Sequence, residues 1–216
     1  MKYFYFLLIL LLTSCVEIIE DLKLNLDGSG TFKYTLNLSS SKTKVKSFLF
    51  LDSLDGKKVL KENEIKEKIK TLRNDLLKEP GITKVLISED YENYVVKFEI
   101  DFKNVDNLEN GLKNVVKNFY PNNDYDYDWV SYNNKVLIRN IPSFSVDYIK
   151  TYPSSNFTNL NLGSYTSILR FPSKVDTFTN LSTVKSKSGM AIMVKVTPDE
   201  ILKNQNILNN KINLEK

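Results

Sequence analysis

The sequence predicts an α+β fold, in which antiparallel β hairpins form a sheet and two or three amphipathic helices pack on one face of it. The first observation is a series of segments in which apolar and polar residues alternate, separated by short turn sequences. The second is a pair of longer segments in which apolar residues recur every three or four positions. The third is a composition that is 42% hydrophobic and 12% aromatic, which is enough to build a core.

The first predicted element is a hairpin close to the N-terminus. Val16–Leu26 and Thr31–Leu38 both alternate, and the turn sequence Asp27–Gly30 lies between them. An Asp-Gly pair between two alternating segments is a strong hairpin signal, because glycine adopts positive φ at little cost. After this hairpin, Ser39–Ser47 is predicted to be a polar connector and Phe48–Leu51 a short buried strand.

Two predicted helices alternate with two further hairpins. Glu62–Lys78 carries an apolar stripe with charged residues opposite and ends before a Pro-Gly pair, and Asp106–Phe119 carries a second stripe. Pro142–Ser164 has no clear periodicity. The remaining strands are predicted at Ile82–Ser88, Tyr94–Phe102, Trp129–Tyr132, Lys135–Ile141, Tyr165–Phe171, Val175–Val184 and Ala191–Val196.

The last predicted element is a C-terminal helix over residues 197–216. Thr197 is suited to cap its first turn, and Glu200 stands three residues later, where it completes a capping box. Leu208 and Ile212 continue an apolar face along the segment.

The first fifteen residues have the features of a secretory signal. Met1 and Lys2 precede the apolar segment Tyr3–Leu12, which at roughly ten residues is too short to span a bilayer. The following Leu12–Cys15, Leu-Thr-Ser-Cys, resembles the lipobox of bacterial lipoproteins. The resemblance implies cleavage before Cys15 and acylation of both its sulfur and its new amino group, which makes the membrane a partner of the mature chain.

This interpretation divides the chain into a signal peptide, residues 1–14, and a single α+β domain, residues 15–216, whose residues 15–26 form the tether and first strand. A signal peptide without lipidation, with Cys15 present by chance, and an N-terminal membrane anchor remain as alternatives. A catalytic thiol at Cys15 is disfavoured because the chain has no histidine to activate it.

The residue inventory narrows the possible chemistry. With no histidine and one cysteine, zinc sites and histidine-based triads are excluded or nearly so, and no phosphate-binding or dinucleotide fingerprint is present. We therefore expect a non-enzymatic protein without a cofactor. The net charge of +4 is scattered among acidic residues, which argues against a nucleic-acid partner.

A weak metal candidate lies before the third hairpin. In an extended segment Asp124, Asp126 and Asp128 share one face and repel one another, and a calcium ion would relieve that repulsion. The segment lacks the glycine bend and bidentate glutamate of a calcium loop, so we expect no metal and a solvated acidic loop. A hydrolase that uses a carboxylate pair such as Asp126 and Asp128 is the least favoured function.

Two short motifs resemble a group of bacterial envelope lipoproteins that includes the mycobacterial LppM-type proteins. One is Asp27–Gly30; the other is Phe171–Val175 (Phe-Pro-Ser-Lys-Val), followed by Asn180, which resembles the Phe-Pro-Gly-x-Val…Asn stretch of that group. The resemblance spans about Cys15–Val196 and implies an envelope-facing α+β domain, with a fold suggestive of lipid binding. Ser173 stands where glycine is usual, which puts the form of that turn in question.

The predicted function is therefore an acyl-anchored envelope lipoprotein that binds lipid or another envelope component. A cavity between sheet and helices is the expected ligand site. Its candidate lining residues are Val95, Phe98, Leu112, Val115 and Ile168. The alternative is a structural or assembly partner that docks an envelope protein through a sheet edge or the aromatic loop Tyr120–Trp129. Val16 in place of an inner-membrane retention aspartate favours the outer membrane, and the lack of a dense acidic cluster immediately after Cys15 favours its periplasmic face.

Overall fold

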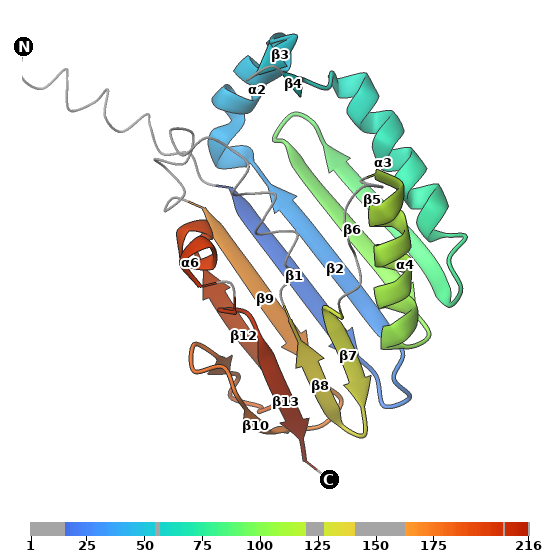
Figure 1. Ribbon diagram of the computed structural model, residues 1–216, viewed down its shortest axis with the longest axis vertical. Coiled ribbons are helices and arrows are strands. Elements are labelled where there is room, and N and C mark those ends of the chain that lie inside the picture. The colour runs from blue at the N-terminus through green and yellow to red at the C-terminus, as the bar shows by residue number, and fades with distance from the viewer. Residues whose placement is uncertain (1–15, 55–56, 120–127, 141–162, 205, 216) are drawn as a thin grey trace, which may run out of the picture.

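The computed structural model describes residues 16–54, 57–119, 128–140, 163–204 and 206–215. It is a mixed α+β structure, which confirms the predicted fold class (Figure 1). Cys15, Asp124, Asp126 and most of the stretch without periodicity lie outside the described residues.

The larger sheet has seven strands, with β1 at its centre. In spatial order these are β11 (Val184–Lys185), β12 (Ala191–Val196), β9 (Ser164–Arg170), β1 (Glu17–Leu24), β2 (Gly30–Asn37), β6 (Val95–Phe102) and β5 (Ile82–Asp90). The predicted β1–β2 and β5–β6 hairpins are present, and Gly28 has a φ of 82° in the first turn. Its neighbour Gly30 packs so tightly that an added Cβ would lie 2.2 Å from the carbonyl oxygen of Lys23. The parallel pairing of β1 with β9 joins the two halves of the chain.

The smaller sheet has four strands and includes the C-terminal strand. Its order is β10 (Val175–Phe178), β13 (Asn210–Leu214), β8 (Val136–Arg139) and β7 (Val130–Asn133). Asn134 and Lys135 form the β7–β8 turn with positive φ values of 48° and 64°. A separate short pair consists of β3 (Ser53–Leu54) and β4 (Lys57–Lys58).

Four α-helices and a short 3-10 turn are described. They are η2 (Ser39–Ser41), α2 (Lys42–Phe50), α3 (Glu62–Leu76), α4 (Val105–Phe119) and α6 (Pro198–Lys203). The helices α3 and α4 match the two predicted amphipathic helices, and both contribute apolar side chains to the main core.

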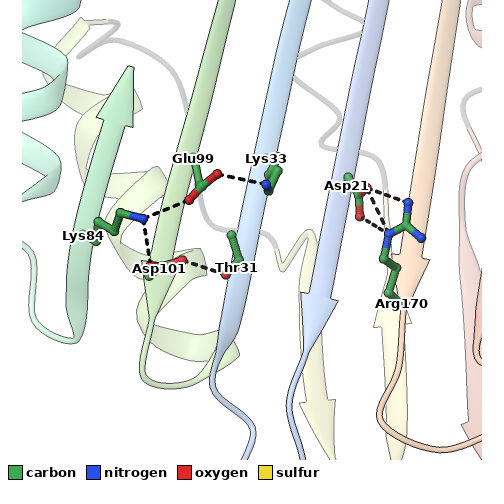
Figure 2. A network of polar contacts seen from close by, with 7 residues as sticks. All are labelled: Asp21, Thr31, Lys33, Lys84, Glu99, Asp101 and Arg170. Carbon is green, nitrogen blue, oxygen red and sulfur yellow. Dashed lines mark hydrogen bonds and ion pairs between the residues drawn. The ribbon is translucent and has the colours of Figure 1, made fainter. Parts of the chain in front are cut away.

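The helices α3 and α4 and the four-stranded sheet all pack on the same face of the seven-stranded sheet (Figure 1). The helices cover one part of that face and the small sheet covers another part. The core between these layers contains fully buried side chains from each of them. Examples are Leu22 of β1, Leu76 of α3, Leu108 of α4, Leu137 of β8 and Ile212 of β13. On the opposite face of the large sheet, which we call the open face, the side chains of Lys33, Lys84 and Arg170 are 56%, 44% and 48% exposed (Figure 2).

Three sequence predictions about local structure are wrong. Ser39–Leu51 is not a connector and a buried strand, because η2 and α2 occupy it and Phe48 and Phe50 are exposed. Val175–Val184 is not one strand but contributes β10 to the small sheet and the start of β11 to the large one. The predicted helix over 197–216 ends at Lys203, and Asn210–Leu214 forms β13. The Thr197–Glu200 capping box that predicted the start of this helix is present.

The Phe171–Val175 motif connects β9 of the large sheet to β10 of the small sheet. Phe171 and Val175, at its two ends, are 4% and 1% exposed and belong to the main core. Ser173 is not among the described residues with positive φ, so this turn does not require glycine. Asn180 donates from Nδ2 to the carbonyl oxygens of Ile207 and Asn209, at 2.7 and 3.1 Å, and so holds the turn before β13.

Candidate functional site

Several strands end together where the described chain begins. Glu17, the first residue of β1, pairs with Asn37 at the end of β2 and with Ser164 at the start of β9. On the far side of β9, Val196 at the end of β12 reaches the same end of the sheet. We call this the N-terminal end of the sheet; α2 and α6 also lie there (Figure 1).

Val16 is fixed directly to the sheet at this end. Its carbonyl oxygen accepts a hydrogen bond of 2.8 Å from the backbone N–H of Ser164. Gly163 allows this approach, because an added Cβ would lie 3.1 Å from both that oxygen and Cγ of Pro198. Val16, the residue that follows Cys15 in the sequence, therefore belongs to the folded body.

A cavity of about 460 Å³ opens beside Val16. Seven of its ten lining residues are polar or charged, although apolar atoms contribute a similar share of the lining surface. The lining residues are Val16, Glu17, Asn37, Ser40, Gly163, Ser164, Lys195, Val196, Thr197 and Glu200. The charged residues in this lining suit a ligand that has polar or charged groups better than a purely apolar one.

The two carboxylates of this cavity have defined partners. Asn37 Nδ2 donates to Glu17 Oε2 at 3.1 Å, and Glu200 Oε2 accepts from the backbone N–H and hydroxyl of Thr197 at 2.7 and 2.9 Å. The bonds from the Thr197 backbone and side chain lower the pKa of Glu200, so it is ionised at neutral pH. Lys195 is the basic residue of the lining.

The five residues predicted to line an apolar cavity lie on two faces of the large sheet. Phe98 packs near Tyr34 on the covered face, with ring centroids 6.5 Å apart, and Leu112 and Val115 of α4 join the same core. Val95 lies three residues from Phe98 along β6 and so points to the open face, as does Ile168, which pairs with Asp21. The structure thus brings three of the five together and separates them from the other two.

A buried polar cluster between the two sheets was not predicted from the sequence. Glu20 and Arg139 are 3% and 4% exposed, and Arg139 donates from Nε and Nη2 to the two carboxylate oxygens of Glu20 at 3.0 and 2.9 Å. Tyr165 donates its hydroxyl to Glu20, and the guanidinium of Arg139 lies 5.0 Å from the ring centroid of Trp129. The charges are thus compensated within the core, and the cluster joins β1, β8 and β9.

The cluster also perturbs neighbouring ionisable groups. Burial and then the charge of Glu20 raise the pKa of Tyr34, which pairs with Glu20 across β1 and β2, to about 12. The same two causes raise the pKa of Tyr165 well above its usual range. Burial disfavours the charged form of Arg139 and by itself would lower its pKa. The interactions with Glu20 and Tyr165 outweigh this effect and raise the pKa of Arg139 above its ordinary value. These groups keep their protons throughout the neutral range.

Stability is expected to fall between about pH 10 and pH 12 because of Tyr34. Over this interval tyrosines of the unfolded chain lose their protons while Tyr34 in the fold keeps its own, so the unfolded state binds fewer protons and gains stability as the pH rises. Urea unfolding across this interval should show a steeper fall for the parent chain than for Tyr34→Phe. Equal slopes would contradict the assignment.

The open face of the large sheet carries charges that are paired with one another (Figure 2). Glu99 contacts Lys33 at 2.9 Å and Lys84 at 3.0 Å, and these bonds lower its pKa. Further along the sheet, Arg170 donates to Asp21 at 2.9 Å. Exposed pairs of this kind contribute at most about 1 kcal/mol each. This face therefore resembles a solvated sheet surface more than a binding site of one charge sign.

Asp128 is the only residue of the calcium candidate that the structure describes. It contacts the ammonium of Lys113 at 3.1 Å, which lowers its pKa, and Lys113 also contacts Glu109 of α4 at 2.8 Å. Within the described parts of the chain, no three aspartate, glutamate, histidine or cysteine side chains group to hold a metal ion. Likewise, none of the described helices has the length and apolar character needed to cross a membrane.

Comparisons with known proteins give little further information. No family model and no curated protein matches the chain. Among solved structures, the fold is similar to the NMR structure of the folded domain of Mycobacterium tuberculosis LppM. The TM-score is 0.43 at 11% sequence identity, and the match covers 94% of this chain and 92% of that one.

Proposed function

We propose that this chain is a non-enzymatic envelope lipoprotein, held on a bilayer by acyl groups on Cys15, whose domain binds a lipid or another envelope component. The observation that carries the proposal is a lipobox-like sequence directly before a residue that is bonded to the sheet. Leu12–Cys15 resembles a lipobox, which supports cleavage before Cys15, and the carbonyl oxygen of Val16 accepts a hydrogen bond from Ser164. The proposed acylated residue is thus adjacent in sequence to a residue of the folded body.

The cavity beside Val16 is the proposed ligand site. Its position next to Val16, which follows the proposed acylation site, supports binding at the level of the lipid headgroups, and the carboxylate, lysine and amide residues of its lining suit their polar chemistry. The outer membrane is the proposed location because Val16, and not an aspartate, directly follows Cys15. Its periplasmic face is proposed because no dense acidic cluster comes immediately after Cys15.

The tether is tested by replacing Cys15 with serine in cells fed an alkyne-bearing fatty acid. The parent chain is expected to incorporate the label and to migrate at its processed size. Cys15→Ser is expected to lose the label and to retain the signal segment, since the sulfur that accepts the diacylglycerol is absent. Labelling or normal processing of Cys15→Ser would contradict the proposal.

Docking of an envelope protein is the second candidate, and the edges of the large sheet favour it. The edge strands β5 and β11 present Leu86 and Val184 at 49% and 60% exposure. An exposed edge can accept a further strand. Cross-linking in intact cells from positions 86 and 184 distinguishes the candidates: one recurrent protein adduct supports docking, and its absence supports lipid binding.

A further inference from the structure

We propose that α2 and β3, residues 42–54, form a second membrane contact that docks on an anionic bilayer surface beside the acyl anchor. The placement of this contact rests on the proposed tether at Cys15. The segment departs from the sequence prediction of a buried strand, and its side chains indicate what it contacts instead.

The apolar side chains of this segment face outward. Phe50 is 76% exposed and Phe48 46%, while Leu51 and Leu54 are 40% and 42% exposed. No residue of α2 is buried, whereas α3 and α4 each direct an apolar stripe into the core. Several exposed apolar side chains within one short segment indicate an interaction surface, and aromatic residues are favoured at the level of lipid headgroups.

The same segment is basic. Between residues 39 and 61 the sequence has six lysines and two aspartates. Lys58 and Lys61 are paired, with Glu64 at 2.5 Å and Asp52 at 3.1 Å, but Lys44 and Lys46 form no ion pair within the described residues. Each lysine near an anionic bilayer strengthens binding through its attraction to the negative surface. Basic residues beside exposed aromatic ones are the composition of interfacial membrane contacts.

The segment lies at the end of the sheet where the chain is proposed to be anchored. η2 and α2 directly follow Asn37, which pairs with Glu17, the second residue after Cys15. Figure 1 shows α2, β3 and β4 projecting from the N-terminal end of the sheet, where β1 begins. Because Val16 is bonded into the sheet, the acyl chains hold this end close to the bilayer. The charge and the position together favour an anionic lipid surface over a protein partner.

The test uses the chain from Val16 to Lys216, which lacks Cys15, so that acylation cannot affect the outcome. Every described strand and helix and every buried core residue lies in this part of the chain. Flotation with vesicles of phosphatidylglycerol and phosphatidylethanolamine is expected to show binding that weakens with salt. Vesicles of phosphatidylcholine alone are expected to bind far less, because they lack the negative charge.

Two variants and a control locate the contact. Phe50→Ser with Leu54→Ser is expected to weaken binding about tenfold or more, because these side chains no longer enter the interface. Lys44→Gln with Lys46→Gln is expected to weaken it and reduce its salt dependence. Leu181→Ser, at a site 99% exposed on another connection, should bind like the parent chain. All substituted positions except Lys44 are clearly exposed, and circular dichroism verifies folding.

The proposal is overturned if the chain does not bind anionic vesicles, or if the segment variants bind as well as the parent chain while folded. The proposal would also be overturned if the parent chain bound an envelope protein in place of lipid and the segment variants lost that binding. Loss of vesicle binding would leave the fatty-acid labelling of Cys15 unchanged, so the two proposals fail separately.

Discussion

Arg139→Met is expected to lower the free energy of unfolding by about 3–5 kcal/mol, the cost of leaving one partner of a buried ion pair without the other. Glu20 would retain a carboxylate that is 3% exposed and that now lacks its two bonds to Arg139. The hydroxyl of Tyr165 cannot neutralise that charge. The loss should appear in urea unfolding as a lower midpoint with an unchanged slope.

A matched exposed pair provides the control for this prediction. Arg170 donates to Asp21 with similar distances, 2.9 and 3.1 Å from Nε, but the side chain of Arg170 is 48% exposed. Arg170→Met should therefore cost no more than about 1 kcal/mol. The double variant Glu20→Leu with Arg139→Met should recover most of the loss, because it removes both charges. A small effect of Arg139→Met alone would show that the cluster is hydrated in solution.

Ile212→Ala and Leu214→Ala are each expected to cost about 2–5 kcal/mol, because they leave cavities in the core between the sheets. Ile212 is 0% exposed and pairs with Leu137 of β8, and Leu214 is 6% exposed. Lys211→Ala, on the exposed side of the same strand, should change stability by no more than about 0.5 kcal/mol. Thermal or urea unfolding of the three variants measures this alternation.

The same variants distinguish the strand from the helix that the sequence predicted. In a helix, Leu208 and Ile212 share a stripe, but Leu214 lies about 200° around the axis from Ile212 and points away. A large loss at Ile212 with none at Leu214 would therefore support the helix. Losses at both positions support β13.

The elements with repeated local signals were predictable from the sequence. The β1–β2 hairpin follows from an Asp-Gly pair between two alternating segments, and α3 and α4 follow from apolar stripes. The prediction for the α2 segment was wrong because Phe48–Leu51 is a short apolar run, and periodicity cannot assign such a run to a strand, a helix or a surface position. For β13 the capping box at Thr197 gave a correct start, but nothing local signalled that the helix ends at Lys203.

The candidate sites depend on contacts that no local pattern encodes. Arg139 and Tyr165 are 119 and 145 positions from Glu20 along the chain. The parallel β1–β9 pairing brings Tyr165 to Glu20, whereas Arg139 reaches Glu20 from β8 of the small sheet. One signal was available: Glu20 occupies an inward position in a strand where Leu22 and Leu24 are buried. A charged residue at such a position predicts a buried partner, but not which residue it is.

The most direct test of the anchored-domain proposal is tandem mass spectrometry of the N-terminal peptide of the mature protein, isolated from the membranes of the organism that produces it. The expected peptide begins at Cys15 and carries a diacylglycerol on sulfur together with an amide-linked acyl chain. A peptide that contains Cys15 without acyl groups, or a mature chain that begins at any other residue, would contradict the proposal.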